Sequence, residues 1–262
     1  MIKICASLST LFQDVPWPGR FSAAISAGFD GVEIQFPYVE PSGVLASAAR
    51  ASGCPVILIN GPVSPTNPFG IACNPDLRVQ FRAQLPFIEE YALALGVRYV
   101  HILAGRTESG SARNFSIETY VENLLQAVEK LRPHGVEILI EPLNAHDAPG
   151  YLLDSFELAA QIVERCGEGV GLQFDIYHAS RMGLDLLGEF HNRLALIRHI
   201  QFADVPGRHQ PGTGSVAFDA FLTKLREVDY QGWLGAEYVP QGESTDGATS
   251  SWLGSWRERL SA

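Results

Sequence analysis

Short apolar runs alternate with longer stretches of helical periodicity along the whole chain. The apolar runs are rich in Ile, Val, Leu and aromatic residues, a composition typical of strands that are buried on both faces. In the longer stretches apolar residues fall on one helical face, as Val121, Leu124 and Val128 do. Eight strands are predicted in this way, and they start at Ile2, Gly31, Pro55, Tyr99, Val136, Val170, Ile197 and Gly232.

Strict alternation of strands and helices predicts parallel strands joined by right-handed crossovers. Eight such units favour an α/β fold of the closed (β/α)8 type, a TIM barrel that residues 1–262 form as a single domain. An open doubly wound sheet is the alternative. No G-x-G-x-x-G follows the first predicted strand, so a dinucleotide-binding fold has no phosphate signature here.

Local signals predict several helix ends and one long loop. Glycines stand just before predicted strands, where the preceding helix has to stop; they are Gly28, Gly53, Gly96, Gly135, Gly169 and Gly232. Asp154, with Glu157 three residues later, predicts a capping-box start for the next helix. From Gly61 to Pro75 the periodicity is lost and prolines recur, which suits either a cover over a pocket or a rigid structural loop.

Composition and charge narrow the class of function. The 262 residues include 19 Lys and Arg against 29 Asp and Glu, a net charge of −10, which argues against a nucleic-acid partner. No apolar run reaches the roughly 18 residues that cross a bilayer, so no membrane partner is expected. The N-terminus lacks a secretory-signal pattern. Four scattered cysteines without a C-x-x-C pair disfavour structural zinc and disulfides, and suit the cytoplasm.

Side chains with oxygen donors follow the apolar part of four successive predicted strands. Glu141, Asp175, Gln201 and Glu237 lie at the ends of the fifth to eighth strands. In a barrel of this type those ends open into one pocket. Each acid alone would suit a helix cap or a local salt bridge, but three carboxylates in one cavity repel each other unless a cation holds them. The set predicts one divalent metal ion, Mg²⁺ or Mn²⁺ being favoured over zinc by oxygen ligands.

Five segments carry a resemblance to a known family: FSAAISAGFDGVEIQFPY, EPLNAHDAPGYLL, QFDIYH, HIQFADVPGRHQPGTG and AEYVP. They resemble the hydroxypyruvate isomerase family, which includes the 2-oxo-tetronate isomerases and belongs to the xylose-isomerase-like TIM barrels. The resemblance extends from Cys5 to Pro240. It departs between Gly61 and Pro75, where the loop is shorter and differs in sequence, so it leaves the identity of the substrate open.

The resemblance implies roles for individual residues. It makes Glu141 and Glu237 metal ligands and also the catalytic proton-transfer pair, and the other two strand-end residues complete the metal site. His178 and Arg208 would bind the substrate, as similarly placed residues do in related ketose 3-epimerases. A guanidinium also suits a carboxylate, because it offers paired donors. Those epimerases have His at the position of Gln201, which favours the isomerase branch.

The expected activity is that of an intramolecular oxidoreductase acting on a small hydroxy-oxo acid, either hydroxypyruvate and tartronate semialdehyde or a 2-oxo-tetronate. Chelation of the carbonyl and its neighbouring hydroxyl would acidify the C–H and stabilise an enediolate. The two glutamates would move the proton. The alternatives are a ketose 3-epimerase, a metal-dependent endonuclease, which would want more histidine ligands and a basic face, and a non-catalytic sugar-acid binding protein.

Several further residues suit two interpretations. His199 lies two residues before Gln201 and so on the same strand face, where a satisfied histidine beneath the metal layer competes with direct catalysis. His101, in the fourth strand, suits a hydrogen-bonded core position or the pocket floor. Trp252 and Trp256 lie four residues apart, which suits core packing or a contact in a homo-oligomer.

Overall fold

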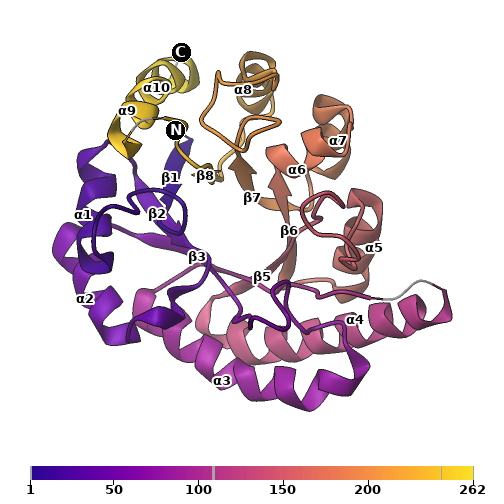
Figure 1. Ribbon diagram of the computed structural model, residues 1–262. Helices are drawn as coiled ribbons and strands as arrows, with labels where there is room; N and C mark the ends of the chain where they lie inside the picture. The colour runs from indigo at the N-terminus through magenta and orange to yellow at the C-terminus, as the bar shows by residue number, and fades with distance from the viewer. Residues whose placement is uncertain (1, 108–109, 243, 262) are drawn as a thin grey trace.

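The computed structural model describes residues 2–107, 110–242 and 244–261, with a closed barrel of eight parallel strands at its centre (Figure 1). The strands are β1 Lys3–Ser7, β2 Gly31–Ile34, β3 Val56–Asn60, β4 Tyr99–His101, β5 Glu137–Ile140, β6 Val170–Asp175, β7 Ile197–Phe202 and β8 Trp233–Ala236. They pair in chain order, and β8 pairs with β1 to close the barrel. The predicted (β/α)8 fold and all eight predicted strands are confirmed.

A ring of helices surrounds the strands (Figure 1). The helices are α1 Trp17–Ser26, α2 Ser42–Ser52, α3 Arg78–Leu95, α4 Ser111–Leu131, α5 Phe156–Cys166, α6 Ile176–Arg181, α7 Leu186–Arg193, α8 Phe218–Glu227, α9 Thr245–Ser250 and α10 Leu253–Ser261, with short 3-10 helices at Pro37–Val39, Pro75–Leu77 and Arg132–His134. Trp252 and Trp256 pack edge to face and are buried, so core packing is the interpretation that holds. Among the residues described, no helix has the length and apolar content needed to cross a bilayer.

Side chains that point into the barrel lie in layers. Cys5, Leu58, Tyr99 and Leu139 pack together in the interior, apart from the larger core between strands and helices. Because side chains alternate along a strand, the residue two positions further on also points inward and lies one layer nearer the C-terminal strand ends. The apolar layer therefore forms a floor, and the inward-facing residues above it line the mouth of the barrel.

Three of the predicted helix boundaries are wrong. Gly169 does not end α5, because that helix ends at Cys166 and Gly167 is its C-cap. The cap of α5 is Ser155 rather than Asp154, because the Ser155 hydroxyl accepts a hydrogen bond from the Leu158 amide at 3.3 Å. Gly232 does not end a helix, since the chain reverses earlier, at Asp229, which has a φ of 48°. The glycines that follow α2 and α3 do adopt the left-handed conformation expected of a helix stop.

The proline-containing loop from Gly61 to Pro75 is held against the chain that follows β4. The Cys73 amide donates to the Ala104 carbonyl at 2.6 Å, and both residues are fully buried. Gly70 lies so close to Leu103 that any Cβ would overlap the Leu103 carbonyl group. These contacts favour a rigid structural loop over a freely moving cover.

Candidate active site

The four oxygen-bearing residues predicted at the strand ends lie side by side at the barrel mouth. Glu141 directly follows β5, Asp175 ends β6, Gln201 lies within β7 and Glu237 directly follows β8. All four are buried, with between 1% and 5% of each residue exposed. Asp175 and Gln201 are register partners across β6 and β7. The closed barrel therefore brings the predicted set together at one edge.

The two residues predicted to bind substrate lie in the same cluster. One atom each of Glu141, Asp175 and His178 lies within 4.8 Å of the others. The guanidinium of Arg208 contacts the Glu237 carboxylate, and its Nη2 lies 3.7 Å from Asp175 Oδ2. Arg208 reaches this position from the loop after β7, where its backbone has a φ of 55°.

Burial and mutual repulsion disturb the acids of this cluster. Burial raises the pKa of Glu141 well above its ordinary value, and the neighbouring Asp175 and Glu237 carboxylates raise it further. Burial also raises the pKa of Glu237 to about 8, against the opposing effect of Arg208. Both glutamates are therefore harder to ionise than exposed ones, and a cation bound in the cluster would favour their ionised forms.

The donor atoms fit a divalent cation. Asp175 Oδ1 accepts a hydrogen bond from the Tyr177 amide at 2.7 Å, whereas its buried Oδ2 has no hydrogen-bond partner within the described part of the chain. The positively charged Arg208 guanidinium lies close to both Asp175 and Glu237, so the cluster already holds one cationic side chain. Carboxylate and amide oxygens without thiolate are ligands that suit Mg²⁺ or Mn²⁺. The strand-end set of four is therefore suited to hold the predicted ion.

Two hydrogen bonds fix the orientation of the Gln201 carboxamide. Its Nε2 donates to Glu33 Oε1 at 2.7 Å, and its Oε1 accepts from Gln173 Nε2 at 2.6 Å. Gln173 Nε2 also donates to Glu141 Oε2 at 2.8 Å. Because the amide nitrogen of Gln201 donates to Glu33, the amide oxygen lies on the side of Gln173 and Glu141.

Sequence reasoning missed Glu33 and Gln173. Both are fully buried, and their hydrogen bonds to residues inside the barrel show that they face its interior. Gln173 stands two residues before Asp175, so strand alternation places it on the same inward face. Glu33 is a lone acid within the apolar run GVEI. The rule that singled out side chains with oxygen donors at strand ends would have found both residues if it had been applied along the whole of each strand.

Three buried histidines have different surroundings. His178 Nδ1 accepts a hydrogen bond from the Asn144 amide at 3.0 Å, which leaves the proton on Nε2, and burial lowers the pKa of His178 well below its ordinary value. His199 Nε2 lies 2.7 Å from Glu33 Oε2, beneath the strand-end acids, whereas its buried Nδ1 has no hydrogen-bond partner among the described residues. His101 is neutral at pH 7, because burial lowers its pKa to about 3.

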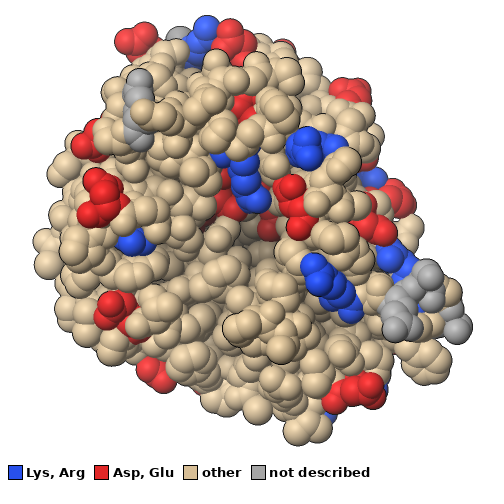
Figure 2. Space-filling view, viewed as in Figure 1, with Lys and Arg blue, Asp and Glu red and all other residues tan. Residues whose placement is uncertain are grey.

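The face of the molecule above the strand ends is hollowed at its centre (Figure 2). Charged side chains gather along the margin of this hollow on the side of β6, β7 and β8. The margin over β2 and β3 is formed by other residues. The mouth of the barrel is thus charged on one side and uncharged on the other.

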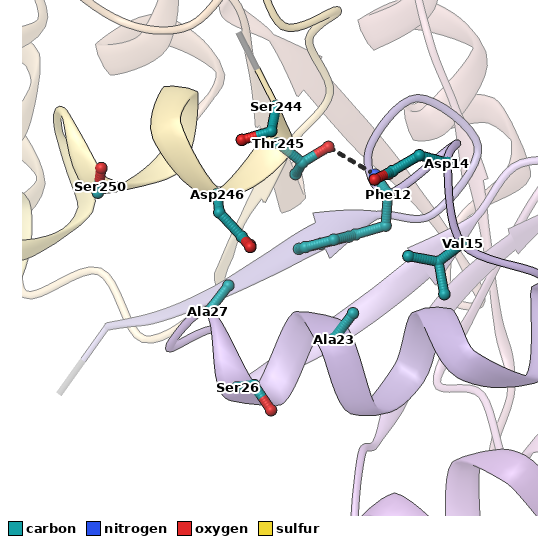
Figure 3. A pocket seen from close by; sticks show the side chains of 10 residues that line it. All are labelled: Phe12, Asp14, Val15, Ala23, Ser26, Ala27, Ser244, Thr245, Asp246 and Ser250. Atoms are coloured by element: carbon teal, nitrogen blue, oxygen red, sulfur yellow. Dashed lines mark hydrogen bonds between the residues drawn. The ribbon is translucent and has the colours of Figure 1, made fainter.

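A second hollow, of about 360 Å³, lies away from these acids, between the loop after β1, α1 and α9 (Figure 3). Phe12 and the exposed Asp14 and Asp246 line it, together with small side chains of α1. Its one buried hydroxyl in the described lining, that of Thr245, is already bonded to the Phe12 amide at 2.8 Å. The barrel mouth, with its buried acids, is therefore the candidate active site.

Comparison with known proteins shows which family has this architecture. The chain matches the model of the xylose isomerase-like TIM barrel family over residues 21–256. The 2-oxo-tetronate isomerase of Pectobacterium atrosepticum is 36% identical over 99% of this chain and 99% of its own length. The hydroxypyruvate isomerase of Escherichia coli is 34% identical over 98% of this chain and 100% of its own. A solved structure described as an AP endonuclease, family 2, from Brucella melitensis has a TM-score of 0.92 at 35% identity, over 97% of this chain and 99% of that one.

The fold and the site define a TIM-barrel protein with a buried acidic pocket at the C-terminal strand ends. The chain belongs to the xylose isomerase-like TIM barrel family. The resemblance to the hydroxypyruvate and 2-oxo-tetronate isomerases that the sequence motifs indicated is confirmed, because relatives of both names match almost the full length.

Proposed function

We propose that the protein is a metal-dependent isomerase that moves a carbonyl between adjacent carbons of a small hydroxy-oxo acid. The observation that carries the proposal is the pair of buried acids, Glu141 and Glu237, at the two ends of the strand-end set. Asp175 and Gln201 lie between them, so a substrate held at the centre has a carboxylate on either side. Full-length relatives named as isomerases of such acids support the same class of reaction.

The chemistry requires a proton to leave one carbon and a proton to arrive at its neighbour, while the hydroxyl oxygen loses its proton and the former carbonyl oxygen gains one. A bound Mg²⁺ or Mn²⁺ ion would polarise the carbonyl and the adjacent hydroxyl, which acidifies the C–H. One of the two glutamates, Glu141 or Glu237, removes that proton, and the other delivers a proton from the opposite face. The burial of both carboxylates limits competition from water during this exchange.

Two further residues position the acid. His178 is neutral and carries its proton on Nε2, so it donates a hydrogen bond to an oxygen of the substrate. The Glu237, Asp175 and Glu141 carboxylates overcome the effect of burial and raise the pKa of Arg208, which stays charged. When a metal ion neutralises those carboxylates, the Arg208 guanidinium is available to pair with the carboxylate of the substrate.

Arg208→Lys is expected to raise KM for hydroxy-oxo acids by about tenfold or more, because lysine keeps the charge but loses the paired donors. KM for a neutral ketose that the enzyme turns over should change much less. Steady-state kinetics with one acid and one ketose measure the contrast. An equal change for both substrates would assign Arg208 to the structure of its loop.

Product analysis separates the isomerase from its nearest rival, a ketose 3-epimerase. Hydroxy-oxo acids and ketoses of three to six carbons are incubated with the protein and Mn²⁺ or Mg²⁺, and the products are identified by NMR. We expect the acids to be converted with the carbonyl moved to the adjacent carbon. Conversion of ketoses alone, with the carbonyl in place and C3 inverted, would establish the epimerase instead.

Two other functions fit the chain less well. An endonuclease needs a basic face for the phosphate backbone, and the net charge is −10. A binding protein without activity has no need of two buried proton-transfer acids. The partner in our proposal is therefore a small molecule, and a cytoplasmic location and a homo-oligomer stay predictions from the sequence.

A further inference from the structure

One side of the barrel mouth carries inward-facing polar groups that the proposed proton transfer does not use. Ser7 ends β1, Asn60 ends β3 and His101 ends β4. Each lies two positions beyond a member of the apolar floor, so all three side chains point into the barrel just above that floor. All three are buried, with 0%, 6% and 1% of the residue exposed, respectively.

These side chains have unpaired polar atoms. The Ser7 hydroxyl, Asn60 Oδ1 and both ring nitrogens of His101 find no hydrogen-bond partner in the described ranges of the chain. Folded proteins rarely leave buried polar atoms unpaired, because each one costs free energy. A single such atom suits a water molecule. Three residues of this kind on one side of a pocket indicate a ligand whose own polar atoms complete them.

The three residues, on β1, β3 and β4, form an arc that meets a catalytic acid at each end, and Glu33 of β2 lies within it as the register partner of Ser7. His101 Nδ1 lies 3.6 Å from Glu141 Oε2. Asn60 is the register partner of His101 across β3 and β4. The register of β1 against β8 places Ser7 beside Glu237. A substituent on the reacting carbons can therefore reach the arc while those carbons lie between the two glutamates.

The chemistry of the arc selects the kind of group that it binds. A hydroxyl, a carboxamide and an imidazole offer both donors and acceptors, which a substrate hydroxyl matches. None of them brings the fixed positive charge that a buried carboxylate needs, whereas Arg208 supplies such a charge beside Asp175 and Glu237. The carboxylate of the substrate and a distal hydroxyl thus belong on opposite sides.

We propose that Ser7, Asn60 and His101 bind a hydroxyl group that lies beyond the two reacting carbons. The preferred substrate is then a four-carbon hydroxy-oxo acid of the 2-oxo-tetronate type. Three-carbon hydroxypyruvate has no such hydroxyl and leaves the arc unpaired. This inference rests on the proposed isomerase function and specifies its substrate.

Two acids that differ by one hydroxyl test the inference: a 2-oxo-tetronate and its 4-deoxy analogue, each with Mn²⁺. For the unchanged protein we expect kcat/KM to be at least about 100-fold higher for the hydroxylated acid, because a site built around a hydroxyl rejects the analogue that lacks it. Equal values for both acids would overturn this inference alone. Absence of turnover with either acid would overturn the proposed function, and this inference with it.

Three variants locate the preference: Ser7→Ala, Asn60→Leu and His101→Phe. Each is expected to reduce the ratio of the two kcat/KM values by about tenfold, since each removes one partner of the hydroxyl. Melting temperatures of Ser7→Ala and Asn60→Leu should not fall, because the Ser7 hydroxyl and Asn60 Oδ1 have no hydrogen-bond partner among the described residues. Ser52→Ala, in α2 on the outside of the barrel, is the matched control and should keep the ratio. Lower melting temperatures with an unchanged ratio would show that the arc serves only the fold.

Discussion

Glu141→Gln and Glu237→Gln are each expected to lower kcat by about 10³-fold, because glutamine keeps the shape of the side chain but neither takes nor gives a proton. The loss should appear in both directions of the isomerisation, since each glutamate acts as acid in one direction and as base in the other. Steady-state assays with the acid on which the unchanged protein is most active measure the effect.

A control is needed because both glutamates are also predicted metal ligands, so loss of metal could mimic loss of the base. The metal content of each variant is therefore determined by elemental analysis. Glu137→Gln makes the same change at the other end of β5, where Glu137 pairs with Arg198 at 2.9 Å, and it should retain full activity. A fully metallated Glu141→Gln or Glu237→Gln protein with unchanged kcat would remove that glutamate from the mechanism.

Heavy water tests the same assignment in the unchanged protein. The glutamate that delivers the second proton takes it from solvent, because the proton captured from the substrate stays on the other glutamate. Turnover in heavy water should therefore place deuterium on the product carbon, which NMR detects. A product without deuterium, together with two bound metal ions per chain, would instead support an intramolecular hydride shift.

The barrel could be predicted from the sequence because its strands are recognisable by their residue composition. Strands of a parallel barrel are buried on both faces, so runs such as VILI before Asn60 are apolar throughout and easily separated from amphipathic helices. Boundaries were harder to predict. Asp154 and Ser155 are both good cap residues, and only the packing of α5 settles that the Ser155 hydroxyl receives the Leu158 amide.

The acids of the site were predictable for a related reason. A carboxylate directly after an apolar strand, as Glu141 is after EILI, is costly to bury, so its presence requires a partner. Glu33 escaped notice because a single acid inside a short strand is outnumbered by its apolar neighbours. Its role depends on Gln201 and His199, which are distant in sequence and meet it only across the closed barrel.

The unpaired groups of the mouth could not have been predicted from sequence. Ser7, Asn60 and His101 are common residue types, and nothing in their neighbours marks them as unpaired. Whether a buried polar atom has a partner is a property of the whole packed structure. The strand register places these three residues in one arc, and only that arrangement indicates that they bind a common ligand.

Removal of the metal is expected to reduce activity to below about 1% of its starting value, since the ion supplies several kcal/mol of charge stabilisation in reactions of this kind. Purified protein should hold about one divalent ion per chain, and EDTA should abolish turnover until Mn²⁺ or Mg²⁺ is restored. The buried carboxylates of the site explain why activity should depend on the metal. Burial and the neighbouring carboxylates raise the pKa of Glu141, so without a cation the cluster does not stay fully ionised.

Stability gives a second measurement that does not depend on turnover. An ion that binds only the folded chain stabilises it by about 2.7 kcal/mol at 100 times its Kd, so added Mn²⁺ should raise the melting temperature of the metal-free protein by several degrees. Gln201→His should still bind an ion, because imidazole is also a ligand, but should bind Mg²⁺ less well relative to Mn²⁺. An unchanged preference would place Gln201 outside the ligand set. Full activity in protein shown by elemental analysis to be metal-free would refute the metal site altogether.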